Sequence, residues 1–459
     1  MGIRDLLTSR KEEHKPLAAA LAEPQAPQSN ASSAAQDYLK LKNKLHLQIL
    51  DKVDLASLEA MSESTLRREI AGLVESLLTE SPAQINDMER RLLVRDIQNE
   101  MLGLGPLELL MADPTVSDIL VNSCNRVYVE RRGRLELSDV AFSDDEHLLR
   151  IIDKIVSRVG RRIDESSPMV DARLPDGSRV NAIIPPIALD GPMVSIRRFS
   201  VVPLKMRDLV ESHKSLTPDM AAMLQGLARS KVNMVVSGGT GSGKTTLLNI
   251  LSGFIPDSER IITIEDAAEL QLQQQHVIRL ETRPPNIEGK GEITQRALVR
   301  NALRMRPDRI VIGEVRGAEA VDMMQAMNTG HEGSLTTIHA NNARDAISRL
   351  ENMVGMAGFN VPHKVARQQI ASAVTIIVQT NRLTDGQRKI TSIQEITGME
   401  GDIITMQELF AFRQTGLQSG GKVAGYFQAT GIRPKFADRL RHHGVDLPDA
   451  MFDPTKRYE

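Results

Sequence analysis

The chain of 459 residues contains no tryptophan, and only 3% of its residues are aromatic. Proteins that bind single-stranded nucleic acid stack successive bases on aromatic side chains, so the composition argues against nucleic-acid binding. The single cysteine, Cys124, excludes an intramolecular disulfide and a zinc site built from four cysteines. A lone thiol fits a reducing compartment without requiring one.

Long apolar runs are missing as well. No stretch approaches the 18 or so consecutive apolar residues of a membrane-spanning helix, and the first residues lack the apolar core of a secretory signal. Positive and negative charges nearly cancel, leaving a net charge of −2, so no overall field attracts nucleic acid or an anionic membrane. We therefore expect a cytoplasmic protein with two or three globular domains.

One stretch matches a complete phosphate-binding loop, G-x-x-x-x-G-K-[ST], between a predicted strand at 232–237 and a predicted helix at 243–254. Its glycines let the backbone curl so that N–H groups face a phosphate, and the helix N-terminus adds partial positive charge. Lys244 then reaches the β- and γ-phosphates, and the Thr245 hydroxyl binds Mg²⁺. The predicted ATP and Mg²⁺ site contains Gly238, Gly239, Thr240, Gly241, Ser242, Gly243, Lys244, Thr245 and Thr246.

Two more apolar strands end in carboxylates. Glu314 follows the strand predicted at 309–313, and Glu265 follows the strand predicted at 260–264. A carboxylate in such a place can orient or deprotonate the attacking water, or hold Mg²⁺. The usual second nucleotide motif has Asp where this chain has Gly313, so Glu265 could take over part of the metal role. The alternative for each glutamate is a charge that merely caps a strand at the surface.

Two histidines, His331 and His339, lie eight residues apart and bracket a strand predicted at 334–338. The spacing matches no metal-binding motif, so we expect no zinc. His339, at the end of a strand close to the nucleotide, could hydrogen-bond the γ-phosphate and report its loss. The alternative for each histidine is an ordinary surface or core residue.

The pattern of apolar residues predicts four parts. Residues 1–35 are rich in Pro, Ser, Ala and Gln and are predicted to be a disordered leader. Residues 36–104 have helical apolar spacing and suggest three helices. Short strands and one helix, at 146–159, suggest an α+β domain over 105–205. Residues 206–459 hold an α/β domain with a largely parallel sheet, because strands and helices alternate up to about residue 400. The tail from 401 is weakly patterned, apart from a helix end near 439–444.

The motifs also resemble a known family. A phosphate loop (238–245), an aspartate box (264–269), a Gly-Glu second motif (310–316) and a histidine box (330–341) occur in the order found in secretion ATPases. These enzymes power type II secretion, type IV pili and type IV secretion. The chain is most similar to the CpaF/TadA type of tight-adherence (Flp) pilus assembly ATPase. The similarity covers about residues 100–400 and includes stretches at 158–162, 166–177 and 280–286 outside the four motifs.

This resemblance implies a RecA-like motor domain topped by the 105–205 domain, with nucleotide bound between the two. It implies a homohexamer, peripheral at the inner membrane, that docks on a platform protein there. Arginines of the smaller domain would reach the phosphates, and Arg197 and Arg179 are the candidates by motif. The alternative for each is a solvated arginine on a strand. The tetracysteine zinc site common in the family is missing, which argues against the type II secretion and type IVa/b pilus extension branch.

Two other functions remain open. Within the same superfamily, the chain could be a traffic ATPase of conjugative type IV secretion. Outside the motor class, it could be a nucleotide-switched scaffold that binds ATP and hardly hydrolyses it, with Gly313 marking a weakened metal site. A hexameric DNA helicase is disfavoured by the net charge and by the shortage of aromatic residues.

Overall fold

The computed structural model describes residues 38, 40–42, 44–49, 62–80, 85–131, 133–198, 204–285, 290–358, 361–418 and 420–458. The predicted leader at 1–35 lies outside these residues. By its contacts the chain divides into two units. The first holds the described residues up to Val129, together with Leu137–Leu174 and Arg179–Ile196. The second holds Glu130–Glu136, Pro175–Ser178 and the chain from Arg197 onward.

Helices form the N-terminal part of the first unit. The described residues between 38 and 49 are helical, followed by α3 (Glu63–Glu80) and α4 (Asp87–Leu102). Helix α4 begins with a reciprocal cap in which Asn86 Oδ1 accepts from Glu89 N at 2.8 Å. Apolar side chains spaced by three or four residues form the shared core of these helices, because that spacing puts them on one face. They include Leu45, Ile49, Ile70, Val74, Leu93 and Ile97.

A six-stranded sheet follows, in the order β3-β2-β1-β6-β5-β4. Its strands are β1 (Val116–Ser123), β2 (Arg126–Arg131), β3 (Arg134–Leu137), β4 (Met169–Arg173), β5 (Arg179–Ile183) and β6 (Met193–Arg197). Alternate residues such as Val194 and Ile196 are buried, because successive side chains of a strand point to opposite faces. Their core also contains the apolar face of α6 (Asp145–Arg158), while the short helix α5 (Leu107–Ala112) was not predicted.

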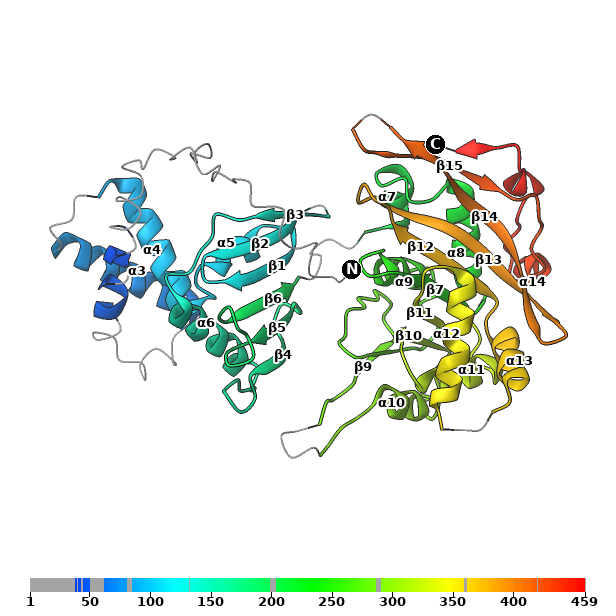
Figure 1. Cartoon of the computed structure of the whole chain (residues 1–459), viewed down its shortest axis with the longest axis horizontal. Helices are drawn as coiled ribbons and strands as arrows, with labels where there is room; N and C mark the ends of the chain where they lie inside the picture. Colours follow the sequence, from blue (N-terminus) through cyan, green and yellow to red (C-terminus); the bar gives the residue numbers. More distant parts are fainter. Residues whose placement is uncertain are drawn as a thin grey trace, which may run out of the picture. The chain divides into compact units, whose positions relative to one another are not determined.

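The second unit is built on a ten-stranded sheet, in the order β16-β15-β14-β13-β12-β7-β11-β10-β8-β9 (Figure 1). The pairings between β12 and β9 are parallel, and those from β12 to β16 are antiparallel. The parallel strands are β7 (Met234–Gly238), β8 (Ile261–Glu265), β9 (Val277–Glu281), β10 (Arg309–Val315), β11 (Leu335–His339) and β12 (Ile376–Arg382).

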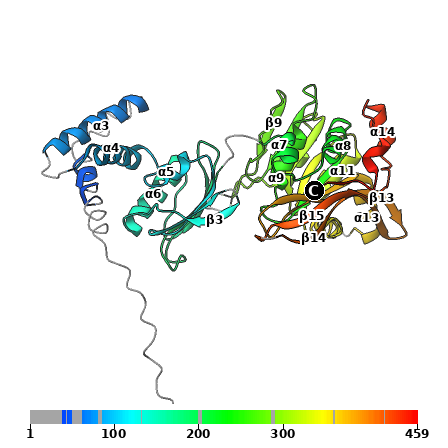
Figure 2. The same cartoon turned by 90° about the horizontal axis from the view of Figure 1, so that it is seen from above.

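Helices cover both faces of the parallel strands (Figure 2). One face packs against α7 (Met206–Glu211), α8 (Pro218–Arg229), α9 (Lys244–Ser252) and α14 (Ala437–His442). The other packs against α10 (Gln295–Ala302), α11 (Glu319–Asn328), α12 (Ala343–Met356) and α13 (His363–Ala373). Burial on both faces explains why β8 and β10 are almost continuously apolar. The predicted fold class, an α/β motor domain with a smaller α+β domain and an N-terminal helical part, is confirmed.

The weakly patterned tail is where the prediction missed most. It holds β14 (Ile403–Leu417) and β15 (Val423–Ala429), which extend the sheet from β13 (Arg388–Glu400), and the short β16 (Arg457–Tyr458). Register shifts interrupt β13 and β14, and a shift of one residue breaks the apolar–polar alternation that identifies a strand. The helix end predicted near 439–444 is present, because α14 ends at His442 and Gly444 follows with φ +75°.

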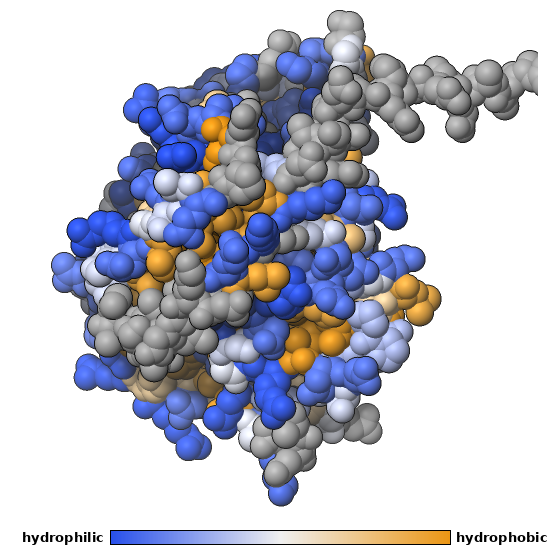
Figure 3. Space-filling view, turned by 90° about the vertical axis from the view of Figure 1, so that its left-hand side faces the viewer, coloured by the Kyte–Doolittle hydropathy of each residue, from blue (hydrophilic) through white to orange (hydrophobic). Residues whose placement is uncertain are grey.

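One face of the first unit carries apolar residues among hydrophilic ones (Figure 3). Met88 on α4 is 73% exposed and Leu47 is 63% exposed. Within the described part of the chain, no helix combines the length and the apolar character needed to cross a membrane.

A buried carboxylate joins three helical segments of the first unit. Glu100 of α4 accepts a hydrogen bond from Lys42 Nζ at 2.6 Å and lies 2.9 Å from His147 Nε2 of α6. Burial alone would raise the pKa of Glu100, but the hydrogen bonds and charges of His147 and Lys42 outweigh it and lower the pKa to about 2. The ionised side chain therefore stabilises this unit.

We predict that Glu100→Gln lowers the free energy of unfolding by about 3 kcal/mol at neutral pH, which corresponds to the shift of the pKa from 4.5 to about 2. Because the folded-state pKa is depressed, this stabilisation is present above pH 4.5 and is lost as the pH falls toward 2. Urea unfolding at pH values from about 7 to about 3 should show that the difference in the free energy of unfolding between the variant and wild type becomes smaller. Glu69→Gln, at an exposed position of α3, is the control, and a gap that stays constant with pH would contradict the assignment.

Candidate nucleotide site

The phosphate loop leaves the sheet at the end of the buried strand β7. A Cβ atom on Gly238 would lie 2.4 Å from both the carbonyl oxygen of Thr380 and the Ser242 hydroxyl, so only glycine fits there. Gly241 and Gly243 have φ angles of +69° and +96°, which residues with a side chain rarely adopt. Helix α9 begins directly afterwards, at Lys244. The loop thus turns tightly in front of a helix N-terminus, the arrangement that favours phosphate.

Lys244 lies over this loop. Its Nζ donates a hydrogen bond to the carbonyl oxygen of Gly239 at 3.0 Å. Burial lowers the pKa of Lys244, and the negative charge of Glu314 partly offsets this effect. The loop lysine and the carboxylate at the end of β10 therefore interact electrostatically. Thr245 is half-buried and Thr246 is exposed.

The strand order brings the predicted residues to one edge of the sheet. Strand β11 lies between β7 and β10, and β8 lies on the far side of β10. All four are parallel, so their carboxyl ends share an edge. In this register His339 is the partner of Gly238, where the loop begins. Gly238, His339 and Glu265 thus end three of these strands, and Glu314 is the last residue but one of the fourth.

A β-bulge redirects the side chains at the end of β10. Ile312 pairs with Thr336 and Val315 with Ile338, so β10 contains one extra residue at Gly313–Glu314. The Thr337 hydroxyl donates to the carbonyl oxygen of Gly313 at 2.7 Å. Bulges re-aim side chains and are common beside active sites. The bulge could not be predicted, because a single inserted residue leaves the apolar run intact.

Gly313 lacks a side chain because Glu265 fills its space. A Cβ atom on Gly313 would lie 2.8 Å from Cγ and 3.3 Å from Oε2 of Glu265, on the neighbouring strand. The Glu265 side chain thus occupies the place that an aspartate at position 313 would need. This geometry explains in steric terms why the chain departs from the usual motif.

Glu265 is 3% exposed. Its Oε2 accepts hydrogen bonds from the backbone N–H groups of Glu269, at 2.7 Å, and Leu270, at 3.0 Å. Its Oε1 is buried and has no hydrogen-bond partner among the described residues. Burial raises the pKa of Glu265 to about 7, although the two N–H groups favour the charged form. An unpartnered oxygen of this kind suits a bound cation or its water.

Glu314 is held by a neighbour that the sequence analysis did not single out. Arg316 donates to Glu314 Oε2 from Nε at 2.9 Å and from Nη2 at 2.6 Å. The arginine side chain is 64% exposed and lies 3.4 Å from Asp266 Oδ2. The two hydrogen bonds from Arg316 orient the Glu314 carboxylate. Because ion pairs as exposed as this one contribute little to stability, Glu314 can exchange Arg316 for another partner.

Two more contacts to the loop come from β12 and β13, on the side of β7 away from β11. The Thr380 hydroxyl, on β12, donates to the carbonyl oxygen of Ser242 at 2.8 Å. Arg388, the first residue of β13, donates from Nε to the carbonyl oxygen of Gly241 at 2.9 Å. Neither residue belongs to a recognisable motif. Only the pairing of β12 with β7, which cannot be read from local sequence, brings them to the loop.

The remaining predicted residues lie elsewhere. His331 precedes β11 by four residues and is therefore at the opposite edge from the loop of the same chain; its Nδ1 is buried and has no hydrogen-bond partner among the described residues. Arg179 and Arg197 lie on the adjacent strands β5 and β6 of the smaller sheet, where Arg179 is half-buried and Arg197 exposed.

The residues present suit a Mg²⁺ ion that is held by only a few protein ligands. Across the described ranges, no group of three or more His, Cys, Asp or Glu side chains could enclose a metal ion. Mg²⁺ commonly takes only one or two protein ligands and completes its shell with water and substrate phosphates. The Thr245 hydroxyl and Glu265 Oε1 match that smaller requirement.

Comparisons with known proteins agree with these motifs. The family described as Type II/IV secretion system protein matches residues 100–420. A putative conjugal transfer protein of Mycobacterium tuberculosis is 36% identical over 325 residues, which cover 70% of this chain and 92% of that one. Conjugal transfer protein TrbB of Rhizobium radiobacter is 33% identical over 314 residues, 67% of this chain and 91% of that one.

Solved structures give a looser likeness. The VirB11 ATPase of the Brucella suis type IV secretion system has 30% identity and a TM-score of 0.34, over 63% of this chain and 95% of that one. The pilus retraction motor PilT with bound ADP has 19% identity and a TM-score of 0.47, over 74% of this chain and 86% of that one.

We predict that Gly313→Ala destabilises the second unit by about 1–3 kcal/mol, because the new methyl group overlaps Glu265. It should also slow nucleotide turnover by displacing that carboxylate. Gly355→Ala is the matched control, since it lies in α12 with no atom within 4 Å of the added Cβ, and should leave stability equal or improved. Urea unfolding of the two variants tests this, and a Gly313→Ala protein as stable as wild type would contradict the packing.

Proposed function

This chain belongs to the family of type II/IV secretion system proteins, and we propose that it is an ATPase whose hydrolysis drives a secretion or pilus machine. One observation carries the proposal. The phosphate loop, Glu314, Glu265 and His339 end adjacent parallel strands at one edge of the sheet. That is the arrangement needed to hold a triphosphate beside a carboxylate that can accept a proton.

In the proposed reaction, the loop N–H groups and Lys244 bind the β- and γ-phosphates. Glu314 orients a water molecule and accepts its proton as the oxygen attacks the γ-phosphorus and the bond to ADP breaks. Mg²⁺, when bound, neutralises phosphate charge. Thr245 and Glu265 are the residues that would hold it. His339 lies beside the start of the loop, where it can hydrogen-bond the γ-phosphate and respond to its release.

Two kinds of machine are candidates. The sequence motifs suggested tight-adherence pilus assembly. The relatives described above carry names from conjugal transfer, and Type IV secretion system protein VirB11 of Brucella suis is 32% identical over 310 residues, 62% of this chain and 86% of that one. These names favour a conjugative type IV secretion machine. We infer a secretion or pilus motor that docks on an inner-membrane platform protein. Cross-linking that identifies the platform protein decides between pilus assembly and conjugative type IV secretion.

Ring assembly is part of the proposal. Arg197 and Arg179 belong to the smaller sheet, so they act on phosphate only when that sheet meets a nucleotide site, in the same or a neighbouring subunit. A homohexamer of the kind that the family resemblance implies would supply this contact. An arginine that stabilises a transferring phosphoryl group contributes about 10³–10⁵-fold in rate.

We predict that Glu314→Gln keeps ATP binding and lowers turnover by about 10²–10⁴-fold, because the amide keeps the shape and cannot accept a proton. Lys244→Ala should lose both binding and turnover. Glu400→Gln, at the exposed end of β13, is the control and should behave as wild type. Phosphate release and equilibrium nucleotide binding are the measurements. A wild-type protein that binds ATP without measurable turnover would instead support the scaffold function.

We predict that Arg197→Lys binds nucleotide normally and hydrolyses it poorly, because lysine cannot reproduce the planar, two-pronged contact of a guanidinium. Mixing Arg197→Lys with Lys244→Ala protein tests whether sites are shared. If neighbouring subunits complete each site, mixed assemblies regain part of the wild-type rate. Specific activity that stays constant down to concentrations where only monomers exist would rule out the ring mechanism.

A further inference from the structure

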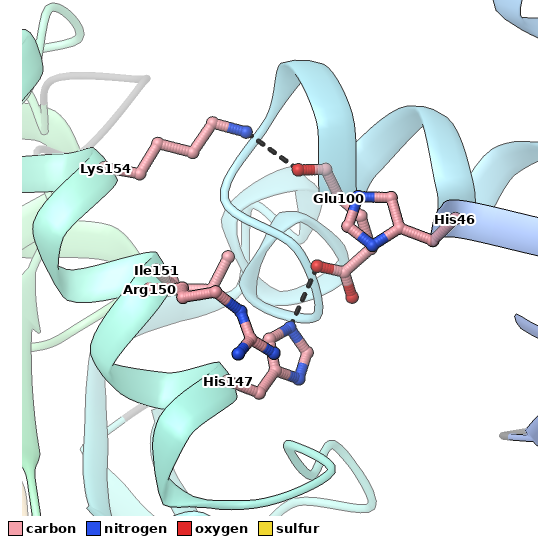
Figure 4. Close-up of a pocket in the computed structure, with 6 residues that line it drawn as sticks. All are labelled: His46, Glu100, His147, Arg150, Ile151 and Lys154. Carbon is pink, nitrogen blue, oxygen red and sulfur yellow. Dashed lines mark hydrogen bonds and ion pairs between the residues drawn. The ribbon is translucent and has the colours of Figure 1, made fainter. Parts of the chain in front are cut away.

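The first unit contains a pocket of about 170 Å³ that the motor function does not use. It lies where the N-terminal helical residues, α4 and α6 meet (Figure 4). The lining residues are His46, Glu100, His147, Arg150, Ile151 and Lys154. Most of these side chains are cationic or can become so, and one is a carboxylate.

The carboxylate is already neutralised by its own partners. Glu100 Oε1 pairs with Lys42, and Oε2 lies 2.9 Å from His147 Nε2. Lys154 donates from Nζ to the carbonyl oxygens of Glu100 and Met101, both at 2.8 Å, and so caps the end of α4. Among the described residues Lys154 makes no ion pair, although Glu100 and Glu108 favour its charged form.

Arg150 and His46 have no such partners. Within the described residues, neither side chain makes a hydrogen bond or an ion pair, although both line the pocket. Arg150 leaves α6 one turn after His147 and one turn before Lys154, so these three side chains form a single stripe. Among the described residues, the pocket therefore presents an unpaired guanidinium, an unpaired imidazole and an ammonium without an ion pair.

We propose that this pocket binds a small anion of the phosphate class. A guanidinium binds two phosphate oxygens with parallel hydrogen bonds, and the imidazole of His46 can donate a third from the opposite side. A pocket of about 170 Å³ has room for orthophosphate or pyrophosphate together with water, which takes about 30 Å³ per molecule. The anion would join the N-terminal helical residues to α6 and strengthen that contact.

The electrostatics of the pocket are consistent with this assignment. Burial lowers the pKa of His46, and the charges of Lys42, His147 and Arg150 lower it further, against the opposing effect of Glu100. Burial and Arg158 likewise lower the pKa of Lys154 to about 8, against Glu100 and Glu108. An anion bound beside His46 and Lys154 would favour the charged form of each.

The test uses the full-length Lys244→Ala protein, in which the phosphate loop is disabled. Calorimetric titration with pyrophosphate should show binding, and pyrophosphate should raise the melting temperature. Adding Arg150→Gln should weaken binding by about tenfold or more, the equivalent of one lost charge-assisted contact, and His46→Gln should weaken it less. Arg150 is exposed and unpartnered among described residues, so its removal should leave the fold intact.

Arg68→Gln, at an exposed position on α3, is the matched control and should bind as the parent does. Orthophosphate and ADP form further arms of the titration. Tighter binding of ADP than of pyrophosphate would identify a nucleotide as the source of the phosphate, and weaker binding would identify a free anion. Absence of binding, or equal affinity with and without Arg150, would overturn the proposal without touching the proposed ATPase function.

Discussion

The nucleotide site depends on the register of four parallel strands. Strand β11 is inserted between β7 and β10, and β8 pairs with β10 on the other side. The strands are buried on both faces, so their register is fixed by packing against two layers of helices. A slip of one residue in β8, β10 or β11 would turn Glu265, Glu314 or His339, respectively, to the other face of the sheet. The sheet thus places the two carboxylates and His339 at the edge from which the phosphate loop starts.

Within that register, two steric fits shape the site. Glu265 fills the space beside Gly313, and Thr380 approaches Gly238 so closely that no side chain fits there. The first fit supplies a buried carboxylate from β8 where related motifs use the neighbouring strand. The second packs the loop against β12, and Arg388 of β13 adds a hydrogen bond to the carbonyl oxygen of Gly241. The antiparallel extension therefore supports the loop as well as enlarging the sheet.

Local sequence was enough to locate the loop at 238–245, because its glycines and Lys244 stand at the fixed spacing of a known motif. It also located Glu265 and Glu314, since each ends a run of buried apolar residues. It could not find Thr380 or Arg388, which reach the loop only through strand pairing across more than a hundred residues. The long strands of the tail were missed for a different reason. Irregular register removes the periodicity on which prediction relies.

The claim that Glu265 replaces the missing aspartate can be tested by moving the carboxylate. Glu265→Ala should lose most ATP turnover. The double variant Glu265→Ala/Gly313→Asp should hydrolyse ATP at least about tenfold faster than Glu265→Ala. The alanine frees the space that the introduced aspartate needs, and a carboxylate returns to the same edge. Steady-state phosphate release by the two folded proteins is the measurement. Glu265→Ala with wild-type turnover, or a double variant no more active than Glu265→Ala, would contradict the account.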